Sequence, residues 1–456
     1  MWVGSSRALG LFGVRPQAVQ AMRGSVRQEA PAFASDDELA KEILALPAYA
    51  PPPRDRPRVV HVIGSLSAGG AERQLVYLAR ESLRGGSVEA RIMLTNPLVG
   101  TAAHYLPLAQ DGGVIVEVAG ATRDEATAAA LALDKGMQRR LIAVDPAYRP
   151  WVIELACEFV RLKPDVVHAW LDHANIWGAI AAFIAGVPTI VLSTRNVNPS
   201  NFPMIDAPYF LAWYRRLASS DRVRFIGNSR VGAEDYADWM GVPRERFAVI
   251  PNGFDHAAMQ PPDDAALAAL RAELGVEGRR VVLGVFRVAE EKEPLDFARA
   301  ANSVLRANDD ACVLVAGDGP MKSALEAQTN AVDAARFRLL GRRSDVAALL
   351  SVADIVMHAS RKEGTPNALL EAQALGCPVV ATRGGGTVDA VEHGGSGFLC
   401  DVGDTDALSR HVLEVLGDDA LRARLSTRAR AFVTERFGLQ RMVDESVAMY
   451  ARKERG

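Results

Sequence analysis

The chain contains 456 residues, of which 49% are hydrophobic and 23% charged, and its formal net charge is −3 at pH 7. This length and composition predict two or three domains of a soluble globular protein, and the small net charge gives no reason to expect a nucleic-acid partner. No apolar run reaches the roughly 20 residues that a membrane-spanning helix needs, so contact with a membrane would be peripheral.

The spacing of cysteine and histidine indicates neither disulfides nor a zinc site. The four cysteines contain no C-x-x-C pair, and the eight histidines show no metal-ligand spacing. A reducing compartment fits this pattern. We therefore expect a cytoplasmic protein without a structural metal.

Residues 1–55 form an N-terminal extension that differs from the rest of the chain. Arginines precede the first acidic residue, Glu29, in a stretch rich in Ala, Gly, Ser and Val. This composition resembles a transit peptide, but a wrongly assigned start or a flexible arm explains it equally well. Ser35 is predicted to cap a short helix that ends near Leu46, and residues 51–53 form a proline linker.

A glycine pair joins the first strand to the first helix of the next segment. Residues 58–64 are typical of a buried strand, and a helix is predicted at 73–81. Between them, Gly69 and Gly70 let another molecule approach the backbone and leave helix N–H groups free. The pattern is not G-x-G-x-x-G, so the dinucleotide-binding fingerprint is absent, and tight-turn packing would also explain the two glycines.

Strands and helices then alternate. Strand-like runs occur at 88–94, 114–118, 166–169, 189–193, 224–227 and 247–250, and helical stretches include 151–162 and 172–185. This alternation predicts a mostly parallel, Rossmann-like sheet with helices on both faces. His168 lies near the carboxyl end of one predicted strand, where a binding role and a role as a hydrogen-bonded core residue are equally supported.

The segment 201–216 is rich in aromatic residues and ends in Arg215 and Arg216. One interpretation is a helix that covers the sheet. The other is an apolar surface with a basic edge, which would receive a lipid-linked acceptor or contact a membrane. Residues 251–255 contain turn-forming residues that fit a hinge between domains.

A second alternation begins with a strand at 281–286 and continues with strands at 312–316 and 337–340. Arg287 and Lys292 lie five residues apart beyond the first of these strands, where a guanidinium fork and an ammonium can grip a diphosphate. A solvated run of charges is the alternative. Asp404 and Asp406 form the D-x-D pattern of metal-dependent transferases, but their place before a helix predicts an N-cap.

Residues 353–398 are the most informative part of the sequence. A strand at 355–358, a polar loop, a helix at 367–375 and a strand at 378–382 form one parallel βαβ unit, with its loop where α/β sheets hold ligands. Glu363 precedes the free N–H groups of the helix start, and Glu371 lies about one turn into the helix. Each carboxylate can accept hydrogen bonds from a diol, although each, taken singly, is also explained as a solvated acid.

This stretch resembles the Glu-x7-Glu signature of the retaining glycosyltransferases of family 4. The resemblance rests on residues 363–367, 370–372 and 376–382 and on Gly385 and Gly386. It implies that Glu371 holds the nucleotide ribose and that Glu363 contacts the transferred sugar. It also implies that the intervening backbone contacts the donor sugar or phosphates, at Gly364, Thr365, Pro366 and Asn367.

The same resemblance covers the two cations of the second alternation. It implies that Arg287 and Lys292 neutralise the departing nucleotide phosphates. Phe286 and Glu293 replace the glycines usual before the arginine and after the lysine, which puts the shape of this loop in question but not its charges.

Three further positions take roles from the resemblance. Gly69 and Gly70 match the loop that faces the donor phosphate and the acceptor, and Gly341 and Arg342 match the backbone beside the nucleotide base. Many family members carry a histidine near the donor sugar, at the position that Arg195 occupies. Either Arg195 takes over that contact or the acceptor differs.

The fold implied by the resemblance is GT-B, an α/β fold with two Rossmann-like domains facing a central cleft. Residues 56–254 would form the acceptor domain, to which a terminal helix at 437–453 crosses back, and residues 255–436 the nucleotide-sugar donor domain. The implied activity is a metal-independent transfer with retention from a nucleotide-diphosphate sugar, with a UDP-sugar favoured, to a glycan or lipid-linked acceptor. No cofactor is expected.

This activity fits polysaccharide or glycolipid biosynthesis at the inner face of the membrane. Alternatives of the same fold are a nucleotide-sugar epimerase and a glycan phosphorylase, although no lysine setting for pyridoxal phosphate is found. A nucleotide-sugar-binding protein without turnover is a further alternative. The joint presence of Arg287, Lys292, Glu363 and Glu371 argues against it, whereas Arg195 keeps it open.

Overall fold

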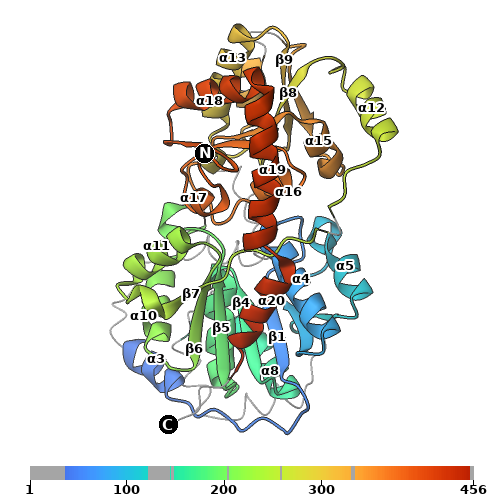
Figure 1. Ribbon diagram of the computed structural model, residues 1–456. Helices are drawn as coiled ribbons and strands as arrows, with labels where there is room; N and C mark the ends of the chain where they lie inside the picture. The colour runs from blue at the N-terminus through green and yellow to red at the C-terminus, as the bar shows by residue number, and fades with distance from the viewer. Residues whose placement is uncertain are drawn as a thin grey trace. The chain divides into compact units, whose positions relative to one another are not determined.

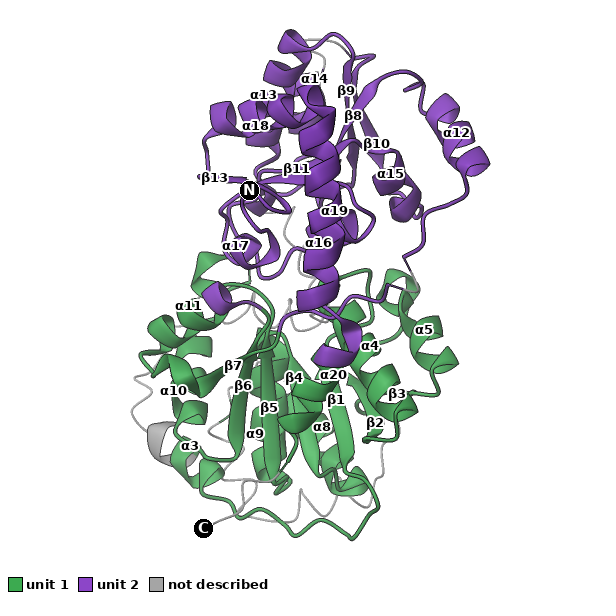
Figure 2. Ribbon diagram, in the orientation of Figure 1, with its two compact units in different colours: residues 1–228, 233–250, 442–456 green, residues 229–232, 251–441 purple. Residues whose placement is uncertain are grey.

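The structure is a computed structural model that describes residues 36–121, 144, 148–202, 205–256, 259–329 and 334–451. The chain divides into two compact units, coloured green and purple in Figure 2. Unit 1 comprises Met1–Asn228, Ala233–Ile250 and Met442–Gly456, and unit 2 comprises Ser229–Gly232 and Pro251–Arg441. The predicted transit peptide or flexible arm falls largely on residues 1–35, outside the described residues.

The described part of unit 1 contains a parallel sheet of seven strands in the order β3-β2-β1-β4-β5-β6-β7. Its strands are labelled in Figure 2, and Figure 1 shows the neighbouring strands β1 and β4. The strands are β1 (Arg58–Ile63), β2 (Glu89–Leu94), β3 (Ile115–Val118), β4 (Val166–Trp170), β5 (Thr189–Thr194), β6 (Val223–Gly227) and β7 (Phe247–Val249). The central strands are buried along almost their whole length, because helices cover both faces of the sheet. The chain runs outward from β1 and returns to β4 on its other side, which makes the gap between β1 and β4 the switch point.

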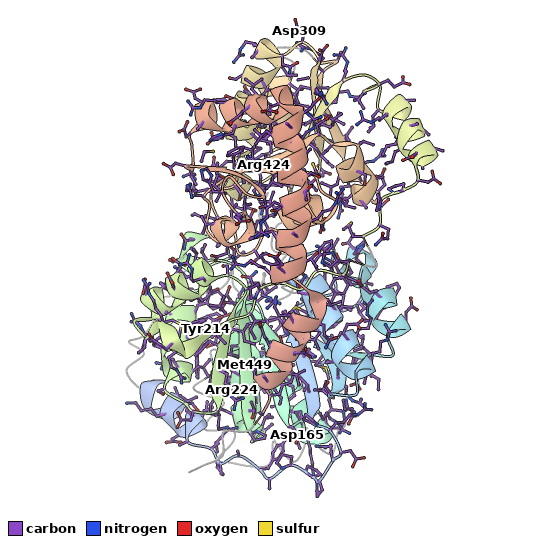
Figure 3. All side chains as sticks on the ribbon, in the orientation of Figure 1. Asp165, Tyr214, Arg224, Asp309, Arg424 and Met449 are labelled. Atoms are coloured by element: carbon purple, nitrogen blue, oxygen red, sulfur yellow. The ribbon has the colours of Figure 1, made fainter. Side chains whose placement is uncertain are left out.

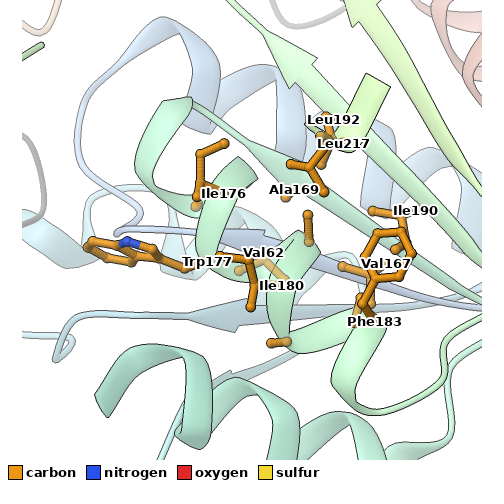
Figure 4. Packing of buried hydrophobic residues seen from close by; sticks show 14 of the residues in the cluster. Val62, Val167, Ala169, Ile176, Trp177, Ile180, Phe183, Ile190, Leu192 and Leu217 are labelled. Carbon is orange, nitrogen blue, oxygen red and sulfur yellow. The ribbon is translucent and has the colours of Figure 1, made fainter. Parts of the chain in front are cut away.

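The core of unit 1 is formed by helices packed on this sheet. The helices are α3 (Asp36–Leu44), α4 (Gly70–Arg84), α5 (Leu106–Asp111), α8 (Arg149–Leu162), α9 (Asp172–Ile184) and α10 (Phe210–Ala218), together with α11 (Arg230–Met240) and α20 (Leu439–Ala448), whose first three residues belong to unit 2. Short 3-10 turns lie at Gly100–Ala103, Pro199–Asn201 and Arg244–Arg246. Figure 4 shows Ile180 and Phe183 of α9 beside the strand residues Val62 and Val167. Ile43 of α3 is fully buried in the same core, so the end of the N-terminal extension belongs to the packed unit.

The aromatic segment lies in the core. Phe210, Trp213 and Tyr214 of α10 are at most 2% exposed. The indole N–H of Trp213 donates to the hydroxyl of Tyr148 at 3.0 Å, and the ring of Tyr148 stacks on that of Tyr209. The prediction of an apolar surface for a lipid-linked acceptor or a membrane is therefore wrong, because the aromatic rings of α10 that would form this surface are buried. The interpretation as a covering helix is confirmed. In the part of the chain that the structure describes, no helix is long and apolar enough to span a membrane.

The last described residues pack on the sheet of unit 1. The guanidinium of Arg224 donates to the carbonyl of Met449, and Figure 3 labels both residues. Tyr450 is 4% exposed, and its hydroxyl oxygen lies 2.9 Å from Nδ1 of His168. These hydrogen bonds fasten the residues after α20 to strands β4 and β6.

The described part of unit 2 contains a parallel sheet of six strands in the order β10-β9-β8-β11-β12-β13. The strands are β8 (Arg280–Val285), β9 (Ala311–Ala316), β10 (Phe337–Gly341), β11 (Ile355–His358), β12 (Val379–Thr382) and β13 (Gly397–Cys400). The helices are α12 (Asp264–Glu273), α13 (Pro294–Ala307), α14 (Lys322–Thr329), α15 (Val346–Val352), α16 (Asn367–Ala374), α17 (Thr387–Ala390), α18 (Thr405–Gly417) and α19 (Asp419–Arg436), with a 3-10 turn at Glu290–Lys292.

Alternate residues of the unit 2 strands face opposite layers of helices. Val282 packs in one apolar cluster with residues of α13 and α18, whereas Val281 and Leu283 pack in another with residues of α12, α15 and α16. The predicted α/β class with two parallel Rossmann-like sheets is confirmed.

Candidate functional site

Two loops of unit 2 meet at the switch point of its sheet. Strand β8 leads outward to β9 and β10, and β11 pairs with β8 on the other side. Ligands of open α/β sheets bind at the carboxyl ends of the strands that flank such a point. The loop after β8 carries Arg287 and Lys292, and the loop after β11 carries Glu363. The predicted charged residues therefore come from the two loops that the topology favours.

Hydrogen bonds to one carbonyl hold these two loops together. The carbonyl oxygen of Glu291 accepts from the N–H of Arg361 at 3.0 Å and from the hydroxyl of Ser360 at 2.9 Å. Glu293, with a φ of 48°, then turns the chain so that Pro294 begins α13. The 3-10 turn that carries Lys292 is thereby fixed against the loop that carries Glu363.

Glu363 is the centre of a buried charged cluster. Its Oε1 lies 2.5 Å from Nζ of Lys292 and 2.9 Å from Nε2 of His358, and Glu363 is 6% exposed. Burial by itself raises the pKa of Glu363, but the Lys292 ammonium and the hydrogen bond from His358 outweigh it and lower this pKa to about 2. At neutral pH Glu363 is therefore a carboxylate that accepts hydrogen bonds and has no proton to donate.

Arg287 occupies the exposed side of the same loop. Its side chain is 41% exposed, and its Nη2 lies 2.5 Å from Oε1 of Glu291, four residues further on. An exposed pair of this kind contributes little stability, so a diphosphate can compete for the guanidinium fork. The loop thus directs Lys292 inward to Glu363 and leaves Arg287 accessible.

The glycines after β12 lie directly against the Glu363 loop. A Cβ on Gly384 would come within 2.0 Å of the carbonyl oxygen of Ser360, and a Cβ on Gly385 within 2.3 Å of the carbonyl oxygen of Glu363. The N–H of Gly386 donates to that Glu363 carbonyl at 2.9 Å. Only glycine permits this approach, and the φ of +55° at Gly385 also favours glycine.

Helix α16 starts immediately after this loop. Thr365 and Pro366 are buried at its start, and Oδ1 of Asn367 accepts from Nδ2 of Asn252 at 2.8 Å. The first-turn N–H groups of the helix lie here, beside the buried Gly364. Glu371, one turn further on, is 6% exposed. The roles of this backbone and of Glu371 in holding phosphate, sugar and ribose stay predictions.

Gly341 and Arg342 follow the outermost strand of the same sheet. Gly341 ends β10 with a φ of 68°, its carbonyl accepts from the N–H of Gly317 at 2.8 Å, and Arg342 is exposed. Because all six strands are parallel, this turn shares its edge of the sheet with the loops described above. Its contact with the nucleotide base stays a prediction.

In unit 1 the glycine pair forms the start of α4, directly after β1. Gly69 is the N-cap and Gly70 the first helical residue. The carboxylate of Glu72 folds back over them, since a Cβ on Gly69 would come within 2.1 Å of its Oε2. Burial raises the pKa of Glu72 to about 7. The pair lies at the switch point of its sheet, as a binding loop would, and its ligand contacts stay predictions.

His168 is a hydrogen-bonded core residue. It is 1% exposed, its Nδ1 lies 2.9 Å from the hydroxyl oxygen of Tyr450, and its Nε2 lies 2.8 Å from that of Ser193. Burial lowers the pKa of His168 well below its usual value, so the ring is neutral. Since both ring nitrogens already have partners within unit 1, the structure supports the core interpretation of His168 over the binding one.

Arg195 follows β5 at the carboxyl edge of the unit 1 sheet. Its guanidinium carbon lies 4.1 Å from the centre of the Trp170 ring. Burial lowers the pKa of Arg195 to about 9, which leaves the group charged at neutral pH. Its substitution for the family's histidine in contacting the donor sugar stays a prediction.

The D-x-D pattern belongs to a helix cap. Oδ1 of Asp404 accepts from the N–H of Ala407 at 2.8 Å, which confirms the predicted N-cap of α18. Among the residues with described side chains, no three His, Cys, Asp or Glu groups are arranged to hold a metal ion. Independence from metal stays a prediction about the reaction.

Comparison with known protein families accounts for both units. Residues 68–258 match Glycosyltransferase Family 4, and residues 268–432 match the glycosyl transferases of group 1. The first match includes Gly69 and Arg195, and the second includes every site residue of unit 2 from Arg287 to Glu371. The chain belongs to the family 4 glycosyltransferases.

Known relatives of this glycosyltransferase are enzymes and proteins of carbohydrate synthesis. It is 28% identical over 423 residues to the Vi polysaccharide biosynthesis protein VipC/TviE of Salmonella typhi, which covers 87% of this chain and 72% of that one. It is 28% identical to the UDP-Gal:alpha-D-GlcNAc-diphosphoundecaprenol alpha-1,3-galactosyltransferase of Escherichia coli, over 63% of this chain and 75% of that one. Neither relative is named as an epimerase or a phosphorylase.

Solved structures share the fold of this glycosyltransferase. The crystal structure of HepE from Anabaena in complex with UDP-glucose has a TM-score of 0.70 and 24% identity, and covers 86% of this chain and 98% of that one. WaaG, a glycosyltransferase involved in lipopolysaccharide biosynthesis, has a TM-score of 0.62 and 15% identity, over 87% and 100% of the two chains. The predicted GT-B fold is confirmed.

Two parts of the glycosyltransferase site are not predicted from sequence. The sequence pattern predicts His358 only as the end of an apolar strand. Its position five residues before Glu363 is the signal in the sequence that could have indicated its contact with Glu363. The three glycines at 384–386 are predicted to end a strand, whereas their close approach to the Glu363 loop is a packing feature. A run of glycines directly after a buried strand is the sequence signal for such an approach.

Proposed function

We propose that this glycosyltransferase moves a sugar from a UDP-sugar to a glycan or lipid-linked acceptor, with retention of configuration and without a metal ion. The ion pair between Lys292 and Glu363 carries the proposal, because it joins the loops after β8 and β11 beside the start of α16. A cation, an ionised carboxylate and free helix N–H groups are thereby gathered at one edge of the sheet. The cation and the helix N–H groups suit phosphate, and the carboxylate suits sugar hydroxyls.

In the proposed mechanism, Arg287 and Lys292 stabilise the negative charge that develops on the departing diphosphate. Preorganised cations are effective in this role because they need no reorientation as the bond breaks. Lys292 is already ordered by its ion pair with Glu363. Glu363, held ionised, accepts hydrogen bonds from the sugar and favours positive charge at its reacting carbon. Glu371 holds the ribose hydroxyls from within α16.

The relatives support the choice of donor and acceptor class. The name of the Escherichia coli relative contains a UDP-sugar donor and a diphosphoundecaprenol-linked sugar, and HepE was crystallised with UDP-glucose. A lipid-linked acceptor is presented at a membrane surface. The proposal therefore includes a cytoplasmic location at the inner face of the membrane, which sedimentation with anionic vesicles tests.

A thermal-shift screen across UDP-, GDP- and ADP-sugars tests the donor, because a ligand that binds the folded state raises the unfolding temperature. We expect UDP-sugars to give the largest shift. The preferred donor is then incubated with oligosaccharide and lipid-linked acceptors, and the anomeric configuration of the product is read by NMR. An inverted product would contradict retention, and conversion of the donor sugar to its epimer without any acceptor would favour the epimerase alternative.

A further inference from the structure

Arg195 in unit 1 has a charge that nothing in the described structure balances. Its guanidinium carbon lies 4.1 Å from the centre of the Trp170 ring, so the plane of the group is packed on an aromatic face. Its Nε is buried without an acceptor, and among the described residues neither of its Nη groups donates a hydrogen bond or forms an ion pair. Stacking on a ring uses the face of the guanidinium and leaves the N–H donors along its edge unused.

Arg222 of the same unit also has a buried Nε without an acceptor, so the difference from Arg195 lies in the Nη groups. Arg222 also stacks on a ring, with its guanidinium carbon 4.4 Å from the centre of Phe183, but its Nη groups donate to the carbonyls of Leu46 and Val187. Arg58 pairs with a carboxylate, Glu89, at 3.0 Å. Buried donors and charges are normally paired in this way because leaving them unpaired is unfavourable. Arg195 is partly buried, and among the described residues its Nη groups have no such partner.

Among the residues that the structure describes, no group that acts on Arg195 supplies a negative charge. Tyr450 interacts electrostatically with Arg195, but burial raises the pKa of the Tyr450 hydroxyl further above its usual value, so this hydroxyl is uncharged at neutral pH. His168 and His61 are neutral because burial lowers their pKa values. Nδ2 of Asn228 donates to the backbone carbonyl of Arg195 at 3.4 Å, so this hydrogen bond does not involve the guanidinium. The cation is therefore held by neutral neighbours at the carboxyl edge of the sheet.

We propose that Arg195 binds an oxyanion of the substrate, either a carboxylate or a phosphate. The inference rests on the proposed function, because it assigns substrate specificity to the same enzyme. A planar fork of N–H donors matches the two oxygens of such a group, and an anion also neutralises the charge, which a sugar hydroxyl does not. Trp170 fixes the plane of the fork in advance, so that little side-chain entropy is lost on binding.

The oxyanion has two possible sources, the donor sugar or the acceptor. In the first case the sugar of the UDP-sugar donor is a uronic acid. In the second case the acceptor carries a phosphate or a uronate. Calorimetry on the 456-residue chain distinguishes them. UDP, UDP-glucose and UDP-glucuronate are titrated for the donor. Inorganic phosphate and methyl α-glucuronide are titrated, with and without saturating UDP, for the acceptor.

Three variants and one control are compared with the wild type. Arg195→Gln removes the charge, Arg195→Lys keeps the charge without the fork, and Arg195→His introduces the residue that the family resemblance implies for this position. Arg216→Gln is the control, since Arg216 also packs on a tryptophan of unit 1, with its guanidinium carbon 5.3 Å from the centre of the Trp213 ring. Circular dichroism and urea unfolding show whether each variant is folded.

A donor source predicts that the wild type binds UDP-glucuronate about tenfold or more tightly than UDP-glucose. Arg195→Gln and Arg195→His lose this preference and keep their affinity for UDP, Arg195→Lys keeps part of it, and Arg216→Gln keeps all of it. If the acceptor supplies the oxyanion, the wild type shows no preference between UDP-glucuronate and UDP-glucose. It then binds phosphate or methyl α-glucuronide, and Arg195→Gln and Arg195→His lose this binding.

The inference is overturned if folded wild type and Arg195→Gln bind all five probes equally. If the wild type does not bind UDP, the proposed function is contradicted instead. Even then the titration of phosphate without UDP still tests Arg195, so that failure of one proposal is distinguished from failure of the other.

Discussion

The ammonium of Lys292 lies 2.5 Å from Oε1 of Glu363, and this ion pair connects the loop after β8 to the loop after β11. The two side chains are only 20% and 8% exposed. Taking charges out of water is unfavourable, so the pair adds little stability relative to an apolar substitute, but removing one partner leaves a buried charge uncompensated. The pair therefore holds the two loops together, and substitution of either partner is expected to destabilise the fold.

Lys292→Met is expected to lower the free energy of unfolding by about 3 kcal/mol at pH 7, near the lower end for breaking a buried pair, because His358 still contacts Glu363. Lys322→Met is the matched control in the same unit. Lys322 and Glu326 are 44% and 49% exposed and 3.8 Å apart, so its effect should be within about 1 kcal/mol. Urea unfolding measures both. Equal effects of the two substitutions would mean that the buried pair has no special role.

Glu363 also predicts how stability depends on pH. Folding lowers its pKa from 4.5 to about 2, so the folded state holds its proton less tightly than the unfolded state does. The stabilisation is complete above about pH 5 and is lost as pH falls towards 2. The difference in unfolding free energy between wild type and Glu363→Gln should shrink by about 2 kcal/mol between about pH 5 and pH 3. A difference that stays constant over this range would show that Glu363 is not held ionised.

The strands of this fold follow from the sequence because each is a short apolar run between breakers. β11 spans Ile355–His358, the predicted range, and the N-cap at Asp404 is likewise set by neighbouring residues. The segment from residue 201 shows the limit. Its aromatic composition fits both a membrane surface and a buried helix, and only packing against α9 and the sheet decides for the helix that begins at Phe210.

The site shows the same division. The Glu-x7-Glu spacing is local, so Glu363 and Glu371 are found from sequence together with the start of α16. The partners of these residues are distant in the chain. Lys292 is 71 residues from Glu363, and the hydroxyl that satisfies His168 belongs to Tyr450, 282 residues away. No spacing rule predicts such contacts, because they depend on strand order and on where the terminal segment packs.

Glu371→Ala is expected to weaken the binding of UDP by about 1–3 kcal/mol, the range for losing a charged hydrogen-bond partner. Glu371 is 6% exposed and lies one turn into α16, where a carboxylate can reach ribose hydroxyls. Calorimetry with UDP alone separates this role from any contact with the sugar. Glu326→Ala, at an exposed position of the same unit, is the control. An unchanged UDP affinity in folded Glu371→Ala would remove the assignment.

Sugar transfer is expected to continue after exhaustive chelation of divalent metals. In the proposed mechanism the charge of the leaving diphosphate is balanced by Arg287 and Lys292, and a metal ion would duplicate them. Initial rates of transfer are compared before and after treatment with EDTA, and again after addition of Mg²⁺ or Mn²⁺. Activity that disappears with EDTA and returns with either ion would contradict metal independence.

Gly385→Ala is expected to reduce transfer because the glycine supports the loop that carries Glu363. The new Cβ would lie 2.3 Å from the carbonyl oxygen of Glu363, whereas a Cβ at Gly403 would meet nothing within 4 Å. Both glycines have positive φ, 55° and 86°, so each alanine carries a similar backbone strain of about 1–2 kcal/mol. Gly403→Ala therefore isolates that strain, and only Gly385→Ala adds displacement of the loop. We expect kcat/KM to fall at least about tenfold for Gly385→Ala, since small misplacement of catalytic groups is costly, and to stay near the wild-type value for Gly403→Ala. If both variants are folded and equally active, the close approach at Gly385 is not what positions Glu363.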